Sequence, residues 1–543
     1  MKGGRIKSVL GSALRVFVVL TLLGMVGSLS TPGFLWGLPD DRHYFSYHPD
    51  EIFLLLPSFG FTQGDWNPHF FNYGTLYIYL VGIPAVLLHL VPDPSIFPAG
   101  LRPLYEQGRA TTAMLGTLTV ALLYLALRRH DKPLAPVSAA LLAVCPLHVL
   151  HRCYATVDVP ATFFLTLAYW AALSGSQRPD AKMGALTGLT VGLAAATKYN
   201  SGLFLIPALV APYLAPPFRA SIAWWISLPL GGLVGFLIGC PYAGGTEFWN
   251  GLRFEAEHMR IGGTLAFVGT GSGWTYHLLH GLPTGLGFPL LGAAILGIAV
   301  AVCRPHRGPR LALLWTITYL GMIGAAREHF IRYLVPLAPF VCVIAAAGLT
   351  WLWLFPRRRF LRATSAGLGL AVIALTASYC IGQVESLIRF DPRDRAWAEL
   401  GHLVTGPNAP FRAGLVQDPW FFHPPVSPYN AGPFSQALFN KWNERSGNRI
   451  VITGWDTKRL AAEHPNLFFL SDLESRDLLR LGRPDATEFV RALRTTYPRR
   501  MVYERPVPRF SWLAPGRDSA PPDWLYASPR ITAYGRPARS SGT

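Results

Sequence analysis

The composition of this 543-residue chain excludes an ordinary soluble protein, because 51% of the residues are hydrophobic and only 14% are charged. The net charge is +18, but the basic residues fall in short clusters between apolar runs. A nucleic-acid partner would require one continuous basic surface, so none is predicted. The six cysteines show neither a CxxC pair nor a spacing typical of metal or redox sites. We therefore predict an integral membrane protein.

Apolar runs predict about eleven membrane-spanning helices, because a span crosses about 30 Å of hydrocarbon at about 1.5 Å per residue. The first run follows "MKGGRIK" and is predicted to be an uncleaved helix, since it is longer than the apolar part of a signal peptide. The predicted spans lie near residues 9–29, 109–127, 134–150, 159–173, 183–196, 202–214, 222–239, 282–303, 311–326, 333–355 and 363–381.

A further run at 76–90 is ambiguous, and the basic loops decide how it is read. If it does not cross, the loops "RRHDK", "SQRPDAK", "CRPHRGPR" and "PRRRFLR" share one side with the basic N-terminus. The positive-inside rule favours that arrangement. We therefore expect 76–90 to be an interfacial or re-entrant helix, with the N-terminus cytoplasmic.

Residues 383–543 differ from the rest of the chain, with many Pro, Arg and Asp and no spanning run. Within them "RIVITGWD" and "NLFFLSDLES" predict strands, and "DATEFVRALRTTY" predicts a helix. The predicted organisation is a polytopic α-helical membrane domain over 1–382, with a first outer loop at 34–108. A small extracytoplasmic α/β domain follows over 383–543.

Acidic side chains are concentrated on the predicted outer side. Asp50, Glu51 and Asp65 lie in the first outer loop, and Asp158 lies at the outer end of a later span. Each of Asp50, Glu51 and Asp158 could simply cap a helix N-terminus. Two acids at outer helix ends in one polar vestibule favour catalysis instead, because carboxylates in hydrocarbon are costly unless water or a reaction partner reaches them.

Basic side chains lie on the same side. Arg109 opens a span, Lys198 lies in the "TKYN" connection, and Arg332 is near the start of another span. Each could extend to lipid head groups, but together they suit a phosphate attached to a lipid. If a sugar is carried on a polyprenyl phosphate, the leaving group is already a stable anion. One carboxylate then needs only to take the proton of the acceptor hydroxyl, as the base of an inverting glycosidase does.

Histidines at the same face, namely His48, His148, His151 and His329, raise the question of a metal site. His148 and His151 form an H-x-x-H pair, but no carboxylate partner follows at a suitable spacing. Hydrogen-bonding roles are therefore expected for them, and a divalent metal or other resident cofactor is not favoured.

The motif "HPDE" and the stretch "GDWNPHFFNYGTL" resemble the first outer loop of GT-C-fold, phospholipid-carrier-dependent glycosyltransferases of the family 39 type. These include the protein O-mannosyltransferases and the lipid A aminoarabinose transferases. "ATVDVP", "AAATKYN" and "RYLVPLAPF" resemble later motifs of the same family, in the same order. Where the aminoarabinose transferases carry a Phe-Glu-Lys-Pro-like segment, this chain has "NYGT", so neither sugar nor acceptor can be carried over.

The resemblance, together with the positions of the acidic and basic residues described above, leads to an expected role for each candidate residue. Asp50 corresponds to the catalytic base, and Glu51 and Asp158 are expected beside it in the catalytic group. The residues expected at the carrier phosphate are Arg109, Lys198 and Arg332. Those expected to line the substrate are His48, Asp65, Tyr199 and Tyr333.

The sequence therefore predicts a plasma-membrane glycosyltransferase that moves a sugar from a polyprenyl-phosphate carrier to an acceptor hydroxyl outside the cytoplasm. The acceptor, whether protein, lipid or glycan, and the oligomeric state stay open. The alternative is a multi-pass transporter or lipid flippase, which would place ionisable residues near mid-span and repeat its two halves. No such repeat is visible in the sequence.

Overall fold

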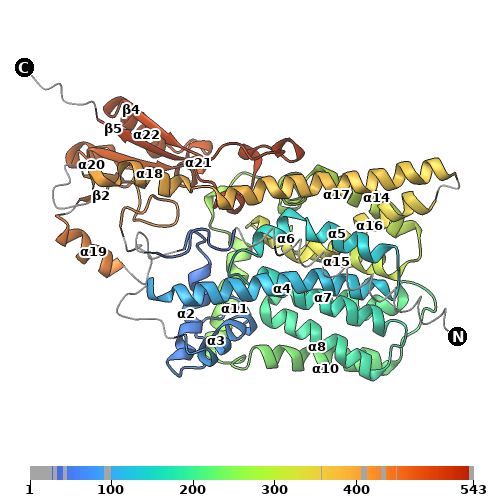
Figure 1. The fold of residues 1–543 in the computed structure, drawn as a ribbon. Helices are drawn as coiled ribbons and strands as arrows, with labels where there is room; N and C mark the ends of the chain where they lie inside the picture. Colours follow the sequence, from blue (N-terminus) through green and yellow to red (C-terminus); the bar gives the residue numbers. More distant parts are fainter. Residues whose placement is uncertain are drawn as a thin grey trace, which may run out of the picture.

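A computed structural model describes residues 27, 33–40, 46–90, 99–355, 358–404, 412–427, 429, 436–447 and 449–536. The predicted first span at 9–29 therefore lies almost wholly outside the described residues. A bundle of roughly aligned helices forms one part of the molecule, and an α/β domain lies beyond one end of it (Figure 1). That end of the bundle also holds the short helices α2, α3 and α11.

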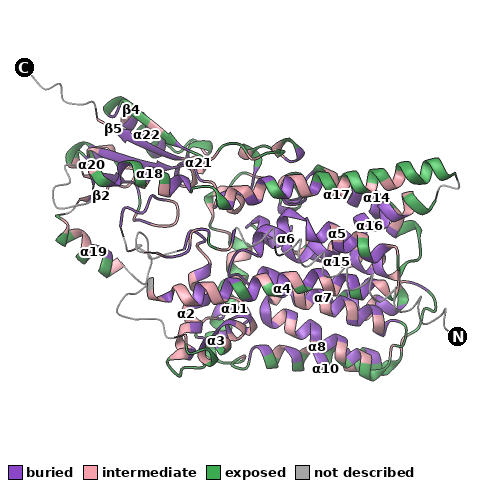
Figure 2. Cartoon of the chain, in the orientation of Figure 1, coloured by how far each residue is buried: buried purple, intermediate pink, exposed green. Residues whose placement is uncertain are grey.

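The helices of the bundle are bounded as follows: α4 (Arg102–Arg128), α5 (Leu134–Ala143), α6 (Pro146–His151), α7 (Asp158–Gly175), α8 (Ala181–Thr197), α9 (Leu205–Val210), α10 (Ile222–Gly239), α12 (Gly273–Tyr276), α13 (Leu282–Leu286), α14 (Phe288–Cys303), α15 (Arg307–Ile323), α16 (Ala338–Leu354) and α17 (Arg359–Ile388). Short 3-10 segments η4 (Tyr199–Phe204) and η8 (Ile331–Leu337) precede α9 and α16. Side chains between helices are buried, whereas α10, α14 and α17 carry many exposed residues on their outer faces (Figure 2).

Four helical stretches among the described residues are long and apolar enough to cross a membrane, and a fifth is added if one bent pair counts as a span. The prediction of eleven spans is therefore not confirmed, and several predicted spans are interrupted. The run at 134–150 breaks before Pro146 into α5 and α6, and the run at 202–214 becomes short pieces. The run at 282–303 breaks at Gly287, where the stretches Gly273–Leu286 and Phe288–Cys303 meet at 119°.

Helices α8 and α10 lie in backbone contact because both carry glycines at four-residue intervals. A Cβ atom added at Gly188 would meet the Leu228 carbonyl oxygen at 1.9 Å, and one added at Gly235 would meet the Leu189 oxygen at 2.2 Å. Small residues at this spacing allow such close approach between helices in a membrane. The rigid pair supports the connection that carries Lys198 at the end of α8.

Three short helices cover the end of the bundle next to the α/β domain: α2 (Glu51–Thr62), α3 (Leu76–Leu87) and α11 (Thr246–Ile261). Helix α3 has 12 residues and packs on α2 through Tyr77, Ile78 and Val81. A helix of that length does not cross a bilayer, which agrees with the prediction of an interfacial helix at 76–90.

The C-terminal domain contains a five-stranded sheet in the order β2-β1-β3-β5-β4. Strand β1 pairs in parallel with β2 and β3, and β5 pairs antiparallel with β3 and β4. The two predicted strands and the predicted helix are confirmed as β2, β3 and α22. The bounds are α18 (Pro392–Leu400), β1 (Ala413–Leu415), α19 (Gln436–Arg445), β2 (Ile450–Ile452), α20 (Thr457–Glu463), β3 (Leu467–Ser471), α21 (Asp472–Arg480), α22 (Pro484–Thr496), β4 (Arg499–Tyr503) and β5 (Ile531–Gly535).

A buried ion network joins the C-terminal domain to the first outer loop. Asp391 accepts hydrogen bonds from Arg393 Nε and Nη2, both at 2.8 Å, and from the Trp36 indole at 3.0 Å. The Arg393 guanidinium stacks on the Tyr47 ring at 3.7 Å. Burial alone would raise the pKa of Asp391, but the Arg393 and Arg505 charges outweigh it and lower the pKa to about 2. The domain is thus fixed to the segment that leads into Asp50.

Candidate active site

The acids Asp50 and Glu51 lie at the start of α2, but neither caps it. Asp50 occupies the N-cap position in a helical backbone conformation, and its side chain accepts no hydrogen bond from the first turn. The capping interpretation therefore does not explain either carboxylate. Their partners lie in distant parts of the chain and differ between the two residues.

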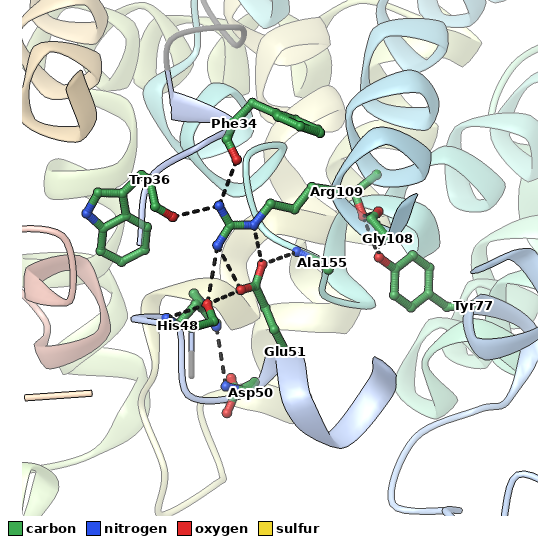
Figure 3. Close-up of polar contacts among 11 residues, drawn as sticks. Phe34, Trp36, His48, Asp50, Glu51, Tyr77, Gly108, Arg109 and Ala155 are labelled. Atoms are coloured by element: carbon green, nitrogen blue, oxygen red, sulfur yellow. Dashed lines mark hydrogen bonds and ion pairs between the residues drawn. The ribbon is translucent and has the colours of Figure 1, made fainter. Parts of the chain in front are cut away.

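Glu51 forms a fully buried ion pair with Arg109 of α4 (Figure 3). Its Oε1 lies 2.8 Å from Arg109 Nε and from the Ala155 amide, and its Oε2 lies 2.8 Å from Arg109 Nη2 and accepts from Ser46. Burial raises the pKa of Glu51, but the Arg109 charge and hydrogen bonds outweigh this and lower the net pKa. Both side chains have 0% exposure, so a substrate cannot reach this pair in the structure as it stands.

Arg109 uses its remaining donors on the first outer loop. Its Nη1 donates to the carbonyl oxygens of Phe34 at 2.7 Å and Trp36 at 2.6 Å. With Glu51 and Ser46 as further acceptors, the guanidinium is saturated. Neither group is accessible to a ligand in this structure, so the geometry does not support the expected roles of Arg109 at the carrier phosphate and of Glu51 in catalysis, which stay predictions.

Asp50 points away from the Arg109 guanidinium (Figure 3). It pairs with Arg332 instead. The distance between Asp50 Oδ2 and Arg332 Nη1 is 2.9 Å, and the Asp50 side chain is 24% exposed. Arg332 belongs to η8, at the start of the helical stretch that continues into α16. Asp50 is thus the carboxylate of the "HPDE" motif that solvent or a ligand can reach.

Asp158 and Lys198 form a second buried ion pair, with 2.6 Å between Oδ1 and Nζ. Asp158 is the first residue of α7, and the cap position is taken by Val157, so capping does not account for Asp158 either. The side-chain exposures are 7% for Lys198 and 3% for Asp158. A bond at this distance between buried charges fixes the ammonium group firmly at the end of α8.

A cavity of about 390 Å³ opens beside this pair, between the end of α8 and α11. Its lining includes Lys198, Tyr199, Tyr333, Tyr73, Glu255 and Arg260, and it is called here the Lys198 cavity. Lys198 Nζ lies 4.9 Å from the centre of the Tyr333 ring, and the Arg332 guanidinium lies 5.8 Å from the same centre. Two cations therefore flank one aromatic ring at the cavity, which confirms that these sequence-distant residues converge.

Two of the expected substrate-lining residues, His48 and Asp65, do not line the Lys198 cavity, whereas Tyr199 and Tyr333 do. His48 is buried, with its ring 4.6 Å from Tyr154, and burial lowers its pKa. Asp65 lies apart from the site, since its carboxylate is 55% exposed and pairs with His69 at 3.1 Å. His69 in turn contacts Glu247 of α11 at 2.9 Å. Asp65 therefore belongs to a surface contact between two outer segments.

Asp523 of the C-terminal domain also contributes to the site, and no pattern in the sequence predicts this. Its Oδ1 accepts from the Ile331 amide and its Oδ2 from the Arg332 amide, both at 3.1 Å. Burial raises the pKa of Asp523 to about 6. Close by, Tyr526 packs its ring 5.7 Å from His48. No periodicity marks these residues, because they lie in an irregular segment whose partners become visible only in three dimensions.

Among the described residues, no group of three His, Cys, Asp or Glu side chains has the geometry to hold a metal ion. His148 and His151 instead bond main-chain oxygens, with Nε2 of His148 3.0 Å from Gly116 and Nδ1 of His151 2.8 Å from Leu147. The candidate site itself offers carboxylates, cations and aromatic rings.

Comparisons with known proteins agree with this architecture. The profile of the family described as dolichyl-phosphate-mannose-protein mannosyltransferase matches residues 105–242, which include most of α4, Asp158 and Lys198. At the level of sequence, no curated protein matches the chain.

Three similar solved structures cover most of the chain. ArnT from Cupriavidus metallidurans bound to undecaprenyl phosphate is 15% identical, with a TM-score of 0.49 over 98% of this chain and 99% of its own. The oligosaccharyltransferase AglB from Archaeoglobus fulgidus, in complex with an inhibitory peptide and a dolichol-phosphate, is 12% identical, with a TM-score of 0.50 over 90% and 72%. The same archaeal enzyme tethered to an acceptor peptide gives 13% identity and a TM-score of 0.51 over 89% and 72%. The GT-C fold predicted from the motifs is confirmed.

Proposed function

We propose that this protein is a glycosyltransferase that moves a sugar from a polyprenyl-phosphate carrier to an acceptor hydroxyl at the extracytoplasmic face of the plasma membrane. The observation that carries the proposal is the grouping of Lys198 and Arg332 around Tyr333, with Asp50 bound to Arg332. The archaeal neighbour of the same fold was solved with a dolichol-phosphate, which supports a lipid-linked donor.

Lys198 and Arg332 are assigned to the carrier phosphate. Both cations are partly covered by protein, where attraction to an anion is stronger than in water. A phosphate between them would share Arg332 with Asp50. As the bond from the sugar to the phosphate breaks, the same cations would stabilise the charge left on the carrier.

Asp50 is assigned the role of base. Once Arg332 contacts the phosphate, the Asp50 carboxylate can accept the proton of the acceptor hydroxyl while the oxygen attacks the sugar carbon. Attack from the side opposite the carrier inverts the configuration at that carbon. Asp158 holds Lys198 in place, and Glu51 with Arg109 anchors the loop that positions Asp50.

Transport is less compatible with the same arrangement. A transporter places ionisable groups near the middle of broken helices. Here the two ion pairs Asp50–Arg332 and Asp158–Lys198 lie at helix ends, and their cations flank Tyr333, which lines the Lys198 cavity.

The test uses the full chain in lipid nanodiscs, a panel of polyprenyl-phosphate sugars, and measurement of sugar release or transfer. We expect one donor to be turned over, and Asp50→Asn to reduce kcat by about 10²-fold to 10⁴-fold while donor binding persists. Asp65→Asn is the matched control, since this aspartate of the same loop lies away from the site. Full activity in Asp50→Asn would refute the base assignment, and failure to bind any donor would favour the transport hypothesis.

A further inference from the structure

A second cavity, of about 690 Å³, lies between the end of α17 and the C-terminal domain, and is called here the tail cavity. Helix α17 contributes Tyr379, Gln383 and Ser386 to its wall. Helix α13 contributes Thr284, and the residues between β4 and β5 supply the rest, including Glu504 to Pro508, Arg517, Trp524 and Arg530. Helix α17 belongs to a stretch that is long and apolar enough to cross a membrane, and the three residues it contributes lie in its C-terminal part.

The charged residues in the wall of the tail cavity are three arginines and one acid. Arg530 is paired with Glu504, and Arg517 is paired with Asp472 at 2.7 Å. Arg505 differs from both, because its side chain is only 3% exposed. A buried guanidinium normally has every nitrogen satisfied by acceptors.

Arg505 does not meet that requirement. Its Nη2 lies 3.1 Å from Asp391 Oδ2, while its Nε and Nη1 have no hydrogen-bond partner among the described residues. Asp391 already receives two hydrogen bonds from Arg393. Two guanidinium groups thus share the Asp391 carboxylate, and Asp394 is a further acid whose charge acts on Arg393.

We propose that the tail cavity binds a phosphate-bearing group, with Arg505 as its principal cation and Arg517 and Arg530 at its rim. Guanidinium groups bind phosphate through two parallel hydrogen bonds, and several of them around one site suit a tetrahedral dianion. Apolar residues of the wall, such as Val507 and Leu525, would contact the rest of the ligand. Both a phospholipid head group and a soluble phosphorylated molecule offer this chemistry.

The tail cavity also adjoins the candidate active site. Trp524 lines the cavity, and its ring lies 6.3 Å from His151. Asp523, the preceding residue, holds the Arg332 main chain. If the proposed function holds, on which this assignment of role rests, the phosphate-bearing group belongs to the acceptor and the Lys198 cavity takes the donor.

The experiment measures binding by calorimetry to the full chain in a micelle of uncharged maltoside detergent. The probes are inorganic phosphate, short-chain phosphatidic acid, and the uncharged diacylglycerol of the same chain length. We expect the two phosphates to bind and the diacylglycerol not to bind. Binding of phosphatidic acid about tenfold tighter than phosphate identifies a lipid head group, whereas equal affinities identify a soluble phosphorylated molecule.

Gly516 provides a matched pair of variants. It lines the tail cavity, and a Cβ atom added there meets no atom within 4 Å. Gly516→Glu places a competing carboxylate beside the arginines, and Gly516→Gln adds the same bulk without charge. Phosphate affinity should fall about tenfold or more in Gly516→Glu and in Arg505→Gln, and persist in Gly516→Gln.

Two results would overturn the proposal: no saturable binding of either phosphate to the wild type, or equal binding in Gly516→Glu and Gly516→Gln. The Gly516 pair keeps the test valid if Arg505→Gln fails to fold. Because phosphate binding is measured without a sugar donor, its failure leaves the result of the Asp50→Asn assay unchanged. The two proposals can therefore fail separately.

Discussion

Asp50 and Glu51 are neighbours in the chain, yet they belong to two differently built regions. Glu51 lies with Arg109 in a dry, saturated cluster where every oxygen and nitrogen has a partner. Asp50 lies with Arg332 at a cavity edge, where both groups retain exposure. The comparison shows that exposure and the number of bonding positions left open, rather than charge or motif membership, separate a saturated buried pair from a pair that a ligand can still reach.

The largest expected effect is a difference in stability between variants of Glu51 and of Asp50. Glu51→Gln leaves Arg109 as a buried charge without its counter-charge, so we expect a loss of about 3–5 kcal/mol in the free energy of unfolding. Asp50→Asn likewise replaces a carboxylate by an amide, but in a partly exposed pair. For this variant we expect the free energy of unfolding to fall by about 1 kcal/mol or less. Thermal denaturation of both variants in detergent measures the difference. Equal losses would remove the distinction between the two regions.

Ligand binding should show the next largest effect. Lys198→Gln removes one of the two cations beside Tyr333, and we expect the Kd for a polyprenyl phosphate to rise about tenfold to hundredfold. Lys182→Gln, at the opposite end of the same helix, is the control and should bind normally. An unchanged Kd in Lys198→Gln would place the carrier phosphate elsewhere.

Asp523 should make unfolding depend on pH in a predictable direction. Burial raises its folded-state pKa to about 6 from an ordinary value of 3.8, so the unfolded chain loses this proton first. The stabilising contribution of the protonated carboxyl is complete below about pH 3.8 and is lost as the pH rises to about 6, at up to about 1.4 kcal/mol per pH unit. The difference in stability between wild type and Asp523→Asn should follow this curve. A difference that is constant from pH 4 to pH 7 would contradict it.

The smallest expected effect concerns the surface contact of the first outer loop. Glu247, and to a lesser degree Asp65, raise the pKa of His69. The contact therefore stabilises the protein only when His69 is protonated and is lost as the pH rises through that raised pKa. His69→Gln should cost less than about 1 kcal/mol at pH 5.5 and nothing at pH 9, because the groups are exposed and screened. Melting temperatures of the wild type and His69→Gln should therefore be equal at pH 9 and differ slightly at pH 5.5.

The sequence predicted the convergence of Asp50, Asp158, Lys198 and Arg332, because each lies at the end of an apolar run and topology places those ends on one side. It did not predict the pairing, since the acids and their partners are far apart in the chain. The sequence analysis also placed Glu51 in the same catalytic group as Asp50. The two could not be told apart from the sequence, because the burial of Glu51 depends on contacts with Ala155 and Ser46 that only the folded structure shows. Broken helices were missed for a related reason: the apolar runs continue across Pro146 and Gly287, where the backbone bends.

The contacts of Asp523 have a consequence for how the protein matures. The Arg332 main chain is held by a residue synthesised after all the described helices of the bundle, and the Trp36 and Tyr47 side chains receive their partners from Asp391 and Arg393. A nascent chain whose membrane helices are already inserted therefore still lacks these contacts. Assembly of this part of the candidate site therefore waits until the C-terminal domain has been made and packs against the bundle.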